Sequence, residues 1–143
     1  MNIGQTENLY TILTKTAELR IYNFGDLNAS EKRLVDAVFD ASEKGERLIS
    51  IQLAERLGVT RSAISQAINR LEEKQILQRV KDKKDKKIAY IEFTPAMRQS
   101  LDEQKASILA GLQKAMEKMG SSETEYFIRS ADKFLRLYEE AKG

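Results

Sequence analysis

The chain has 143 residues, of which 41% are hydrophobic and 32% are charged, and its net charge is +2. This length and composition fit a single domain with a hydrophobic core of its own. The sequence contains no cysteine and no histidine, which excludes disulfides, thiolate nucleophiles, Cys/His zinc sites and a Ser-His-Asp triad.

Enzymes and membrane proteins are also disfavoured. Catalysis by carboxylates alone stays formally open, but no spacing singles out a pair of acidic residues, so we predict no catalytic site, no metal and no cofactor. The segment MNIGQTENLY lacks the basic and apolar regions of a signal peptide. No apolar run approaches the roughly 18 residues that a membrane span needs. We therefore expect a soluble, cytoplasmic protein without a membrane partner.

The charge is distributed unevenly along the chain. Ten basic and four acidic residues lie between Arg56 and Lys87, so this segment carries +6 and the rest of the chain carries −4. A basic block in an otherwise mildly acidic chain is typical of a protein that binds a polyanion. A lysine-rich solvated surface would give the same count, so charge alone does not decide between the two.

The first part of the chain predicts two helices. Apolar residues recur at helical spacing, and Gly25 follows them as a residue that can end a helix. Asn28 and Glu31 have the spacing of a capping box, which opens a second helix that ends near Gly45. The apolar positions of the first helix are Leu9, Leu13, Ala17, Ile21 and Phe24.

A brief strand and a short helix follow. The apolar run Leu48–Ile51 predicts the strand, and Ser50 is expected to cap a helix that ends at Leu57. Ala54 is a small residue that lets this helix cross its neighbour closely.

The next residues predict the second half of a helix-turn-helix. Gly58 supplies the positive φ that a sharp turn needs, and Val59 is expected to fill the core beneath the turn. Thr60 is a good N-cap for a helix over Arg61–Lys74.

A hairpin is predicted after this helix. Ile76–Lys81 and Ile88–Phe93 are rich in residues that favour strands, and the polar sequence KDKKDK separates them. The hairpin would therefore carry a long basic tip.

Two helices complete the chain. Thr94 caps the first of them, with Pro95 at its first position and Gly120 at its end. Ser122 and Glu125 have the spacing of a capping box for the second. Both helices carry heptad-like apolar stripes. The predicted fold is mainly α with a small β-hairpin wing: one domain over 1–143, with a winged helix-turn-helix core over 28–95.

The helix over Arg61–Lys74 has two faces. Ile64, Ile68 and Leu71 follow one another at spacings of four and three and form the buried face. The other face carries side chains of the types that read base edges and phosphates, arginine for guanine and glutamine or asparagine for adenine. An ordinary amphipathic helix is the alternative, but the turn, the cap and the basic hairpin all favour DNA binding. The predicted DNA-binding residues here are Thr60, Arg61, Ser62, Ser65, Gln66, Asn69 and Arg70.

The tip of the hairpin forms the rest of the predicted site. Its lysines are placed to contact phosphates or the minor groove. Asp85 either pairs with Lys87 or another cation and holds the wing in shape, or is a solvated turn residue, and both readings stay open. The tip residues are Lys83, Lys84, Asp85, Lys86 and Lys87.

From about Leu27 to Leu101 the sequence resembles the MarR family of bacterial transcription regulators. LNASEKRLVDAV is similar to the opening of the family's second helix, and LAERLGVTRSAISQAINRLEEKQIL is similar to its helix-turn-helix. RVKDKKDKKIAYIEFTPA is similar to its wing, where the family's D-x-R becomes Asp85-Lys86-Lys87. Lys87 keeps the charge of that arginine but lacks its planar fork. Gln75 stands where a glycine is common.

The resemblance implies a homodimer in which the N-terminal helix (1–25) and the two C-terminal helices (95–143) interleave. The apolar stripes outside the winged helix agree, although packing within one chain would satisfy part of them. A two-fold axis would place two recognition helices one helical turn apart on a pseudo-palindromic operator.

The resemblance also implies a small-molecule effector, often phenolic or carboxylic, in a cleft beside the DNA-binding region. The candidates for such a cleft are Tyr10, Arg20, Tyr22 and Arg47, and each of them also fits a packing or surface role. The absence of cysteine and histidine excludes the family's thiol-oxidation mode and disfavours its zinc-sensing mode.

We therefore predict a sequence-specific double-stranded DNA-binding transcriptional regulator, a repressor that a small-molecule effector releases. The alternative is a winged-helix module used for protein–protein contact, because a fold does not dictate its function. An enzyme is the remote third reading, since the sequence has no glycine-rich phosphate loop.

Overall fold

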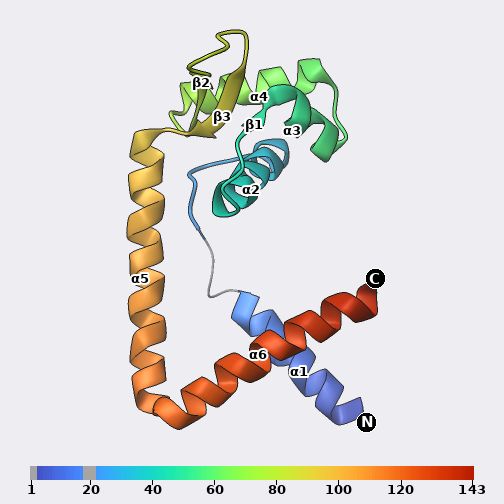
Figure 1. The fold of residues 1–143 in the computed structure, drawn as a ribbon, viewed down its shortest axis with the longest axis vertical. Coiled ribbons are helices and arrows are strands. Elements are labelled where there is room, and N and C mark those ends of the chain that lie inside the picture. Colours follow the sequence, from blue (N-terminus) through green and yellow to red (C-terminus); the bar gives the residue numbers. More distant parts are fainter. Residues whose placement is uncertain (1–2, 18–21) are drawn as a thin grey trace. The chain divides into compact units, whose positions relative to one another are not determined.

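The structure, a computed structural model, describes residues 3–17 and 22–143. Two compact units divide the chain: a winged-helix unit (residues 21–103) and a terminal unit (residues 1–20 and 104–143). The mainly helical fold with a small hairpin is confirmed. In chain order the described elements are α1 (Ile3–Thr16), α2 (Ala29–Glu43), β1 (Leu48–Ile49), α3 (Ser50–Leu57), α4 (Arg61–Glu73), β2 (Leu77–Lys81), β3 (Ala89–Phe93), α5 (Pro95–Met119) and α6 (Ser121–Lys142) (Figure 1).

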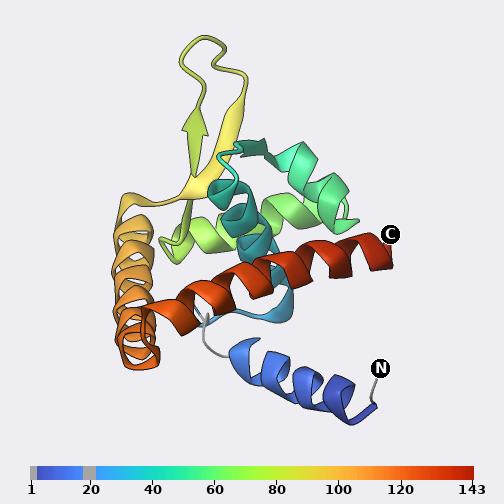
Figure 2. The same cartoon turned by 60° about the horizontal axis from the view of Figure 1, so that its bottom comes forward.

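The winged-helix unit contains a three-stranded antiparallel sheet in the order β1-β3-β2. Ile91 in the central strand pairs with Leu48 on one side and with Arg79 on the other. The predicted hairpin is confirmed to within one residue at its strand ends, whereas β1 is shorter than the predicted run Leu48–Ile51. Figure 2 shows the hairpin extending away from the helices of this unit.

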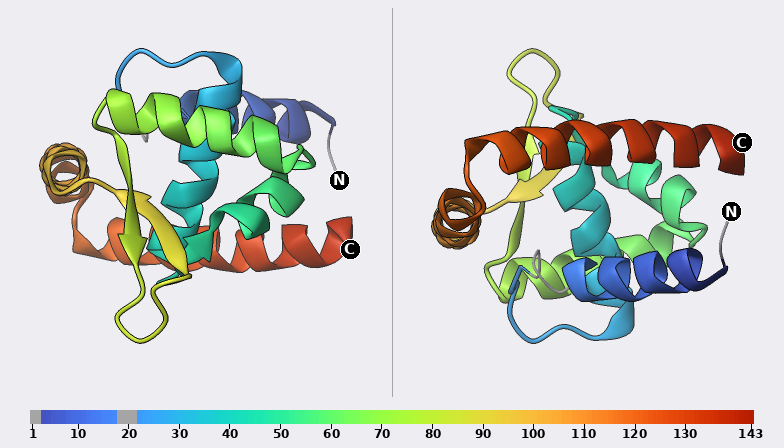
Figure 3. Two further views of the ribbon diagram at one scale, coloured as in Figure 1. Left: turned by 90° about the horizontal axis from the view of Figure 1, so that it is seen from above. Right: turned by 90° about the horizontal axis from the view of Figure 1, so that it is seen from below.

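Three helices, α2, α3 and α4, contact one another and the sheet in the same unit (Figure 3). Leu34 on α2, Leu53 on α3, and Ile68 and Leu71 on α4 have no exposed surface. Burial of one such side chain stabilises the folded state by about 1.5–3 kcal/mol. The core therefore fixes how α4 is rotated about its own axis, and so which of its residues face outward.

The predicted capping box of α2 is confirmed. Oδ1 of Asn28 accepts a hydrogen bond from the backbone N–H of Glu31 at 2.8 Å, and Oε1 of Glu31 accepts one from the N–H of Asn28 at 3.1 Å. Two backbone donors that have no partner within the helix are satisfied in this way.

The predicted extent of the first helix was wrong. Within the described residues α1 ends at Thr16, and Phe24 lies in a non-helical segment of the winged-helix unit. Its ring is buried and stacks on Phe93, with the two centroids 5.9 Å apart. The position of Phe24 is therefore set by packing in this aromatic core and not by the helical spacing of α1. Ile21, another member of the predicted stripe, lies outside the described residues.

Two predicted helix caps were also wrong. Ile49, not Ser50, is the N-cap of α3, because the side chain of Gln52 accepts from the N–H of Ile49 at 2.9 Å and helical geometry begins at Ser50. At the start of α6, Gly120 turns the chain with φ +91° and no side chain caps the helix. Ser122 is thus already helical and forms no capping box with Glu125.

Gln75 has a positive φ of 61°, the left-handed conformation that favours glycine. Its carbonyl oxygen accepts a hydrogen bond from Oγ1 of Thr94 at 2.8 Å, and Oγ1 of Thr94 in turn accepts from the N–H of Met97 at 3.1 Å. Thr94 therefore caps α5, as predicted, and also ties the end of α4 to the beginning of α5.

The terminal unit leaves large apolar side chains uncovered. Neither α1 nor α6 has a buried residue among those described. Tyr10 on α1 is 69% exposed and Phe127 on α6 is 60% exposed. Within the described residues, no helix combines the length and the apolar character that a membrane span requires.

Candidate nucleic-acid interface

The turn between α3 and α4 begins with Gly58 in the left-handed conformation, at φ 65°. The N–H of Val59 then donates to the carbonyl oxygen of Ala54 at 3.0 Å, which closes the end of α3. The prediction that Val59 fills the core was wrong, since its side chain is 36% exposed. Leu53 on α3 and Ile64 on α4, the two helices that the turn joins, are buried in the core instead.

Thr60 caps α4 as predicted: its Oγ1 accepts a hydrogen bond from the N–H of Ala63 at 3.0 Å. Along α4, Ile64, Ile68 and Leu71 are buried, as their spacing predicted. The remaining surface of the helix carries the predicted DNA-binding residues. Ser65 is half-buried, and the exposed ones are Arg61, Ser62, Gln66, Asn69 and Arg70.

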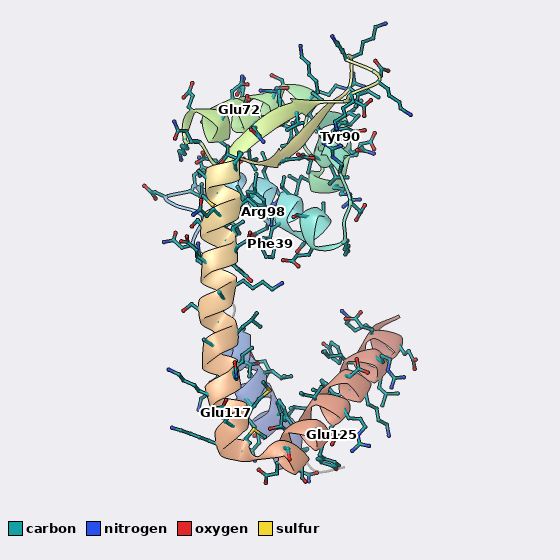
Figure 4. All side chains as sticks on the ribbon, turned by 60° about the vertical axis from the view of Figure 1, so that its left-hand side comes forward. Phe39, Glu72, Tyr90, Arg98, Glu117 and Glu125 are labelled. Carbon is teal, nitrogen blue, oxygen red and sulfur yellow. The ribbon has the colours of Figure 1, made fainter. Side chains whose placement is uncertain are left out.

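Asn69 is held by a residue that the sequence analysis did not single out. Nη1 of Arg79, on β2, donates to Oδ1 of Asn69 at 3.0 Å and also pairs with Glu72. Figure 4 labels Glu72 on α4. The contact joins the wing to α4 and leaves the two amide hydrogens of Asn69 as donors. The side chain of Arg79 is exposed although strand alternation puts it on the same face of β2 as the buried Leu77. No sequence signal identifies its partner.

Glu31 also has a role beyond the helix cap that the sequence predicts. Its side chain is 2% exposed, and Oε2 lies 3.0 Å from Nζ of Lys74 and 4.0 Å from Nε of Arg70. The hydrogen bond with the backbone of Asn28 and the one from Lys74 lower the pKa of Glu31. Glu31 therefore neutralises part of the positive charge at the C-terminal end of α4.

Asp82 organises the tip of the wing. Its Oδ2 accepts from the backbone N–H groups of Lys84 and Asp85, both at 2.9 Å. Its Oδ1 accepts from the hydroxyl of Tyr90 at 3.0 Å. The backbone hydrogen bonds from Asp85 and Lys84, followed by the one from Tyr90, lower the pKa of Asp82, and the bond to Asp82 raises the pKa of Tyr90.

Asp85 has a local structural contact. Its Oδ1 accepts from the backbone N–H of Lys87 at 3.0 Å, so it shapes the turn through backbone contact and not through an ion pair with the Lys87 side chain. The four tip lysines are exposed, and their side chains make no hydrogen bond or ion pair with the residues that the structure describes. Figure 4 shows nitrogen-bearing side chains directed outward from this tip, which leaves these cations available to an external anion.

Arg47, the residue before β1, contacts strand β3 of the wing. The guanidinium of Arg47 lies 4.0 Å from the ring centroid of Tyr90, and its Nε lies 2.5 Å from Oε1 of Glu92. The pairing with Glu92 raises the pKa of Arg47. The carboxylates of Glu72, Asp82 and Glu92 thus bind groups within the winged-helix unit. The tip lysines are exposed and have no such partner among the described residues.

The four effector candidates have different surroundings. Tyr22 packs in the aromatic core, with its ring centroid 4.8 Å from that of Phe39. Arg47 lines a cavity within the winged-helix unit, and Tyr10 lines an apolar groove within the terminal unit. Arg20 lies outside the described residues. In the parts of the chain that are described, no group of acidic side chains could hold a metal ion.

Residues 35–89 match the MarR family. This range runs from α2 to the first residue of β3 and so includes the turn, α4 and the wing tip. No curated protein sequence matches the chain.

Solved structures with a similar fold cover nearly the whole chain. A MarR-like transcriptional regulator from Thermotoga maritima is 18% identical, with a TM-score of 0.64 over 100% of this chain and 99% of that one. FabT from Streptococcus pneumoniae, solved in complex with DNA, is 20% identical, with a TM-score of 0.59 over 95% and 96%. A MarR family protein from Bacillus stearothermophilus is 17% identical, with a TM-score of 0.63 over 100% and 99%.

Proposed function

Because residues 35–89 match the MarR family and the chain has the fold of MarR-type regulators, we propose that this protein is a sequence-specific double-stranded DNA-binding transcriptional regulator. One observation carries the proposal: α4 buries one face in the core and presents arginine, serine, glutamine and asparagine on the other, beside a lysine-bearing hairpin. The structure of FabT with DNA supports it as a precedent for this fold.

In this proposal α4 enters the major groove. Arg61, Gln66 and Arg70 are the residues that read base edges, because arginine suits guanine and glutamine suits adenine. Asn69 acts mainly as a donor, since its Oδ1 already accepts from Arg79. Its amide hydrogens then suit the acceptor atoms that purines present in that groove. Thr60, Ser62 and Ser65 complete the contact near the beginning of the helix.

The wing supplies charge. Lys83, Lys84, Lys86 and Lys87 lie on one turn that Asp82 and Asp85 shape through backbone hydrogen bonds. Lysines on such a turn contact phosphates or enter the minor groove, where the negative potential is strong. This contact adds affinity for any DNA sequence, whereas α4 provides the preference for one.

We propose that a second copy of the chain covers the apolar surface of α1 and α6. Leu9 and Leu13 on α1 and Phe134 and Tyr138 on α6 line an open groove of about 480 Å³ in the terminal unit. The uncovered apolar surface favours association with a partner. A two-fold dimer would place its two α4 helices about 34 Å apart on a pseudo-palindromic operator. Sedimentation equilibrium tests this: the expected mass is twice the 16.3 kDa of one chain.

The regulatory outcome we propose is repression. A dimer on promoter DNA excludes the polymerase, and a small-molecule effector that binds the DNA-free conformation better would release it.

Fluorescence anisotropy with labelled promoter fragments at increasing salt tests DNA binding. Each phosphate that the protein neutralises contributes about −0.9 to the slope of log affinity against log salt concentration. A steep fall of affinity is expected. Negligible binding at low salt would contradict the proposal and favour a winged helix used for protein–protein contact.

A further inference from the structure

The buried side chain of Glu31 has one carboxylate oxygen that the capping box does not use. Oε1 accepts from the N–H of Asn28 and from Nζ of Lys74, each at 3.1 Å. Oε2 accepts no hydrogen bond from the residues that the structure describes, although Nζ of Lys74 lies 3.0 Å from it. Buried acceptors in folded proteins normally have a donor, so Oε2 is an open position for one.

Two cations at the C-terminal end of α4 face Glu31, and they differ in their other contacts. Nζ of Lys74 also donates to the carbonyl oxygen of Asp26 at 2.9 Å, which ties Lys74 to the segment before α2. Nε of Arg70 lies 4.0 Å from Oε2, within ion-pair distance but too far for a hydrogen bond. The side chain of Arg70 is 44% exposed, and its guanidinium makes no hydrogen bond with the described part of the chain. Arg70 is therefore the donor that is free to move onto Oε2.

The edge of the Arg70 guanidinium that faces Glu31 matters for base recognition. An arginine reads guanine through two hydrogen bonds, to O6 and N7. When Nε–H is bonded to a carboxylate, the donors on Nη1 and Nη2 form the edge that points away from it. Arg70 stands about one helical turn after Gln66, on the exposed surface of α4 that we propose enters the major groove. The Nη1–Nη2 edge is thus the one left for a base.

We propose that Glu31 is a positioning residue for DNA recognition: in the DNA complex, Nε–H of Arg70 donates to Oε2 of Glu31, and the guanidinium held in this way reads one guanine in each half-site. The separation of 4.0 Å has only to fall to about 2.8 Å, the usual length of a charge-assisted hydrogen bond. A guanidinium fixed by a buried carboxylate loses less conformational freedom when it meets the base. This inference rests on the proposed function and deepens it, because it adds a residue that determines specificity without touching DNA.

A charge effect and a positioning effect predict opposite results for Glu31→Gln. Glutamine keeps an acceptor for the capping box but offers Arg70 no anionic partner. Removal of a negative charge near DNA would by itself strengthen binding to every sequence. Positioning requires a loss at the preferred site instead. We expect Glu31→Gln to bind the site selected from random DNA about fivefold more weakly, as for the loss of one hydrogen bond, with no weakening on random duplexes.

Duplexes that carry each single base change in the selected half-site locate the effect. Glu31→Gln should lose preference at the base pair where Arg70→Ala loses it, and should cause no further loss there when Arg70 is already alanine. Glu43→Gln, the same change at an exposed position of α2, is the matched control and should keep the full preference. Circular dichroism checks that each variant is folded.

Equal strengthening on all sequences, equal weakening on all sequences, or an unchanged preference at the Arg70 base pair would overturn the proposal. If Glu31→Gln does not fold, NMR of the original chain on the selected site decides. We expect a scalar coupling across the hydrogen bond between Nε of Arg70 and the carboxylate carbon of Glu31, and the absence of this coupling would overturn the proposal. These failures leave DNA binding by the original chain standing, whereas an original chain that binds no DNA contradicts the proposed function and this inference together.

Discussion

Nη1 of Arg79 in the wing donates a hydrogen bond to Oδ1 of Asn69 on α4, over 3.0 Å. The two residues come from the two elements that we propose to touch DNA. The bond fixes which end of the Asn69 amide faces outward, so in the DNA complex that we propose the wing would help to determine what α4 recognises.

Replacement of Arg79 by methionine should therefore weaken binding to the preferred DNA site by about 0.5–1.5 kcal/mol, the value of one hydrogen bond. A double-mutant cycle with Asn69→Ala measures the coupling, and we expect the Arg79→Met effect to shrink when Asn69 is already absent. Arg56→Met, whose guanidinium pairs with Glu46, is the matched control. Strictly additive losses would contradict a positioning role for Arg79.

The wing lysines should act on all DNA sequences alike. Lys83→Ala with Lys84→Ala should lower affinity for specific and random DNA by the same factor and reduce the magnitude of the salt slope by about 1.8. Anisotropy titrations at several salt concentrations measure both quantities. Lys32→Ala with Lys44→Ala, two lysines at α2, is the control with the same change of charge. An unchanged slope in the wing variant would mean that these lysines do not touch phosphate.

Glu31 makes the stability of the winged-helix unit depend on pH. The hydrogen bond with Asn28 and the contact with Lys74 lower its pKa from the usual 4.5, so its carboxylate stabilises the folded state above that pH. This contribution is lost as the pH falls below 4.5 and passes through the lowered pKa. Glu31→Gln should cost about 1–3 kcal/mol at pH 7, and less as the pH falls.

Urea unfolding of both proteins between pH 3 and pH 7 gives this difference directly. Glu43→Gln, at the end of the same helix, serves as the control. If the difference in free energy of unfolding between Glu31→Gln and the original chain stays constant over this pH range, the ionic role of Glu31 is contradicted.

Asp82 should hold the wing tip closed. Asp82→Ala removes the acceptor of the Lys84 and Asp85 amides, and their protection from hydrogen exchange should fall about fivefold, as expected for a loss of about 1 kcal/mol. Asp85→Ala is the control, because it should expose the Lys87 amide and leave that of Lys84 unchanged. If both variants lower the protection of the Lys84, Asp85 and Lys87 amides equally, the tip opens as one cooperative unit. That result would contradict a specific role for Asp82.

The sequence predicted those features that neighbouring residues determine. The capping box of Asn28 and Glu31 and the Thr60 cap rest on contacts between residues three positions apart, and the hairpin joins two strands that follow one another directly in the chain. The prediction that Val59 fills the core failed because that depends on side chains from other elements. Phe24 was misplaced for the same reason, since its ring is buried against Phe93.

Local sequence patterns could not predict the electrostatic contacts of the site either. Glu31 and Lys74 are 43 residues apart in the chain, and the bond between Arg79 and Asn69 crosses from a strand to a helix. Gln75 is an intermediate case. The resemblance to the MarR family indicates that a glycine is common there, and only the structure shows the positive φ of 61° that a glycine would adopt without strain.

The central claim, that α4 reads the base sequence of double-stranded DNA, is tested most directly by selection of bound fragments from random DNA. We expect enrichment of a pseudo-palindrome with half-sites one helical turn apart, to which Gln66→Ala and Arg70→Ala each bind about 1–3 kcal/mol more weakly. An enriched pool with no common sequence, or variants that bind the selected site as the original chain does, would contradict the claim.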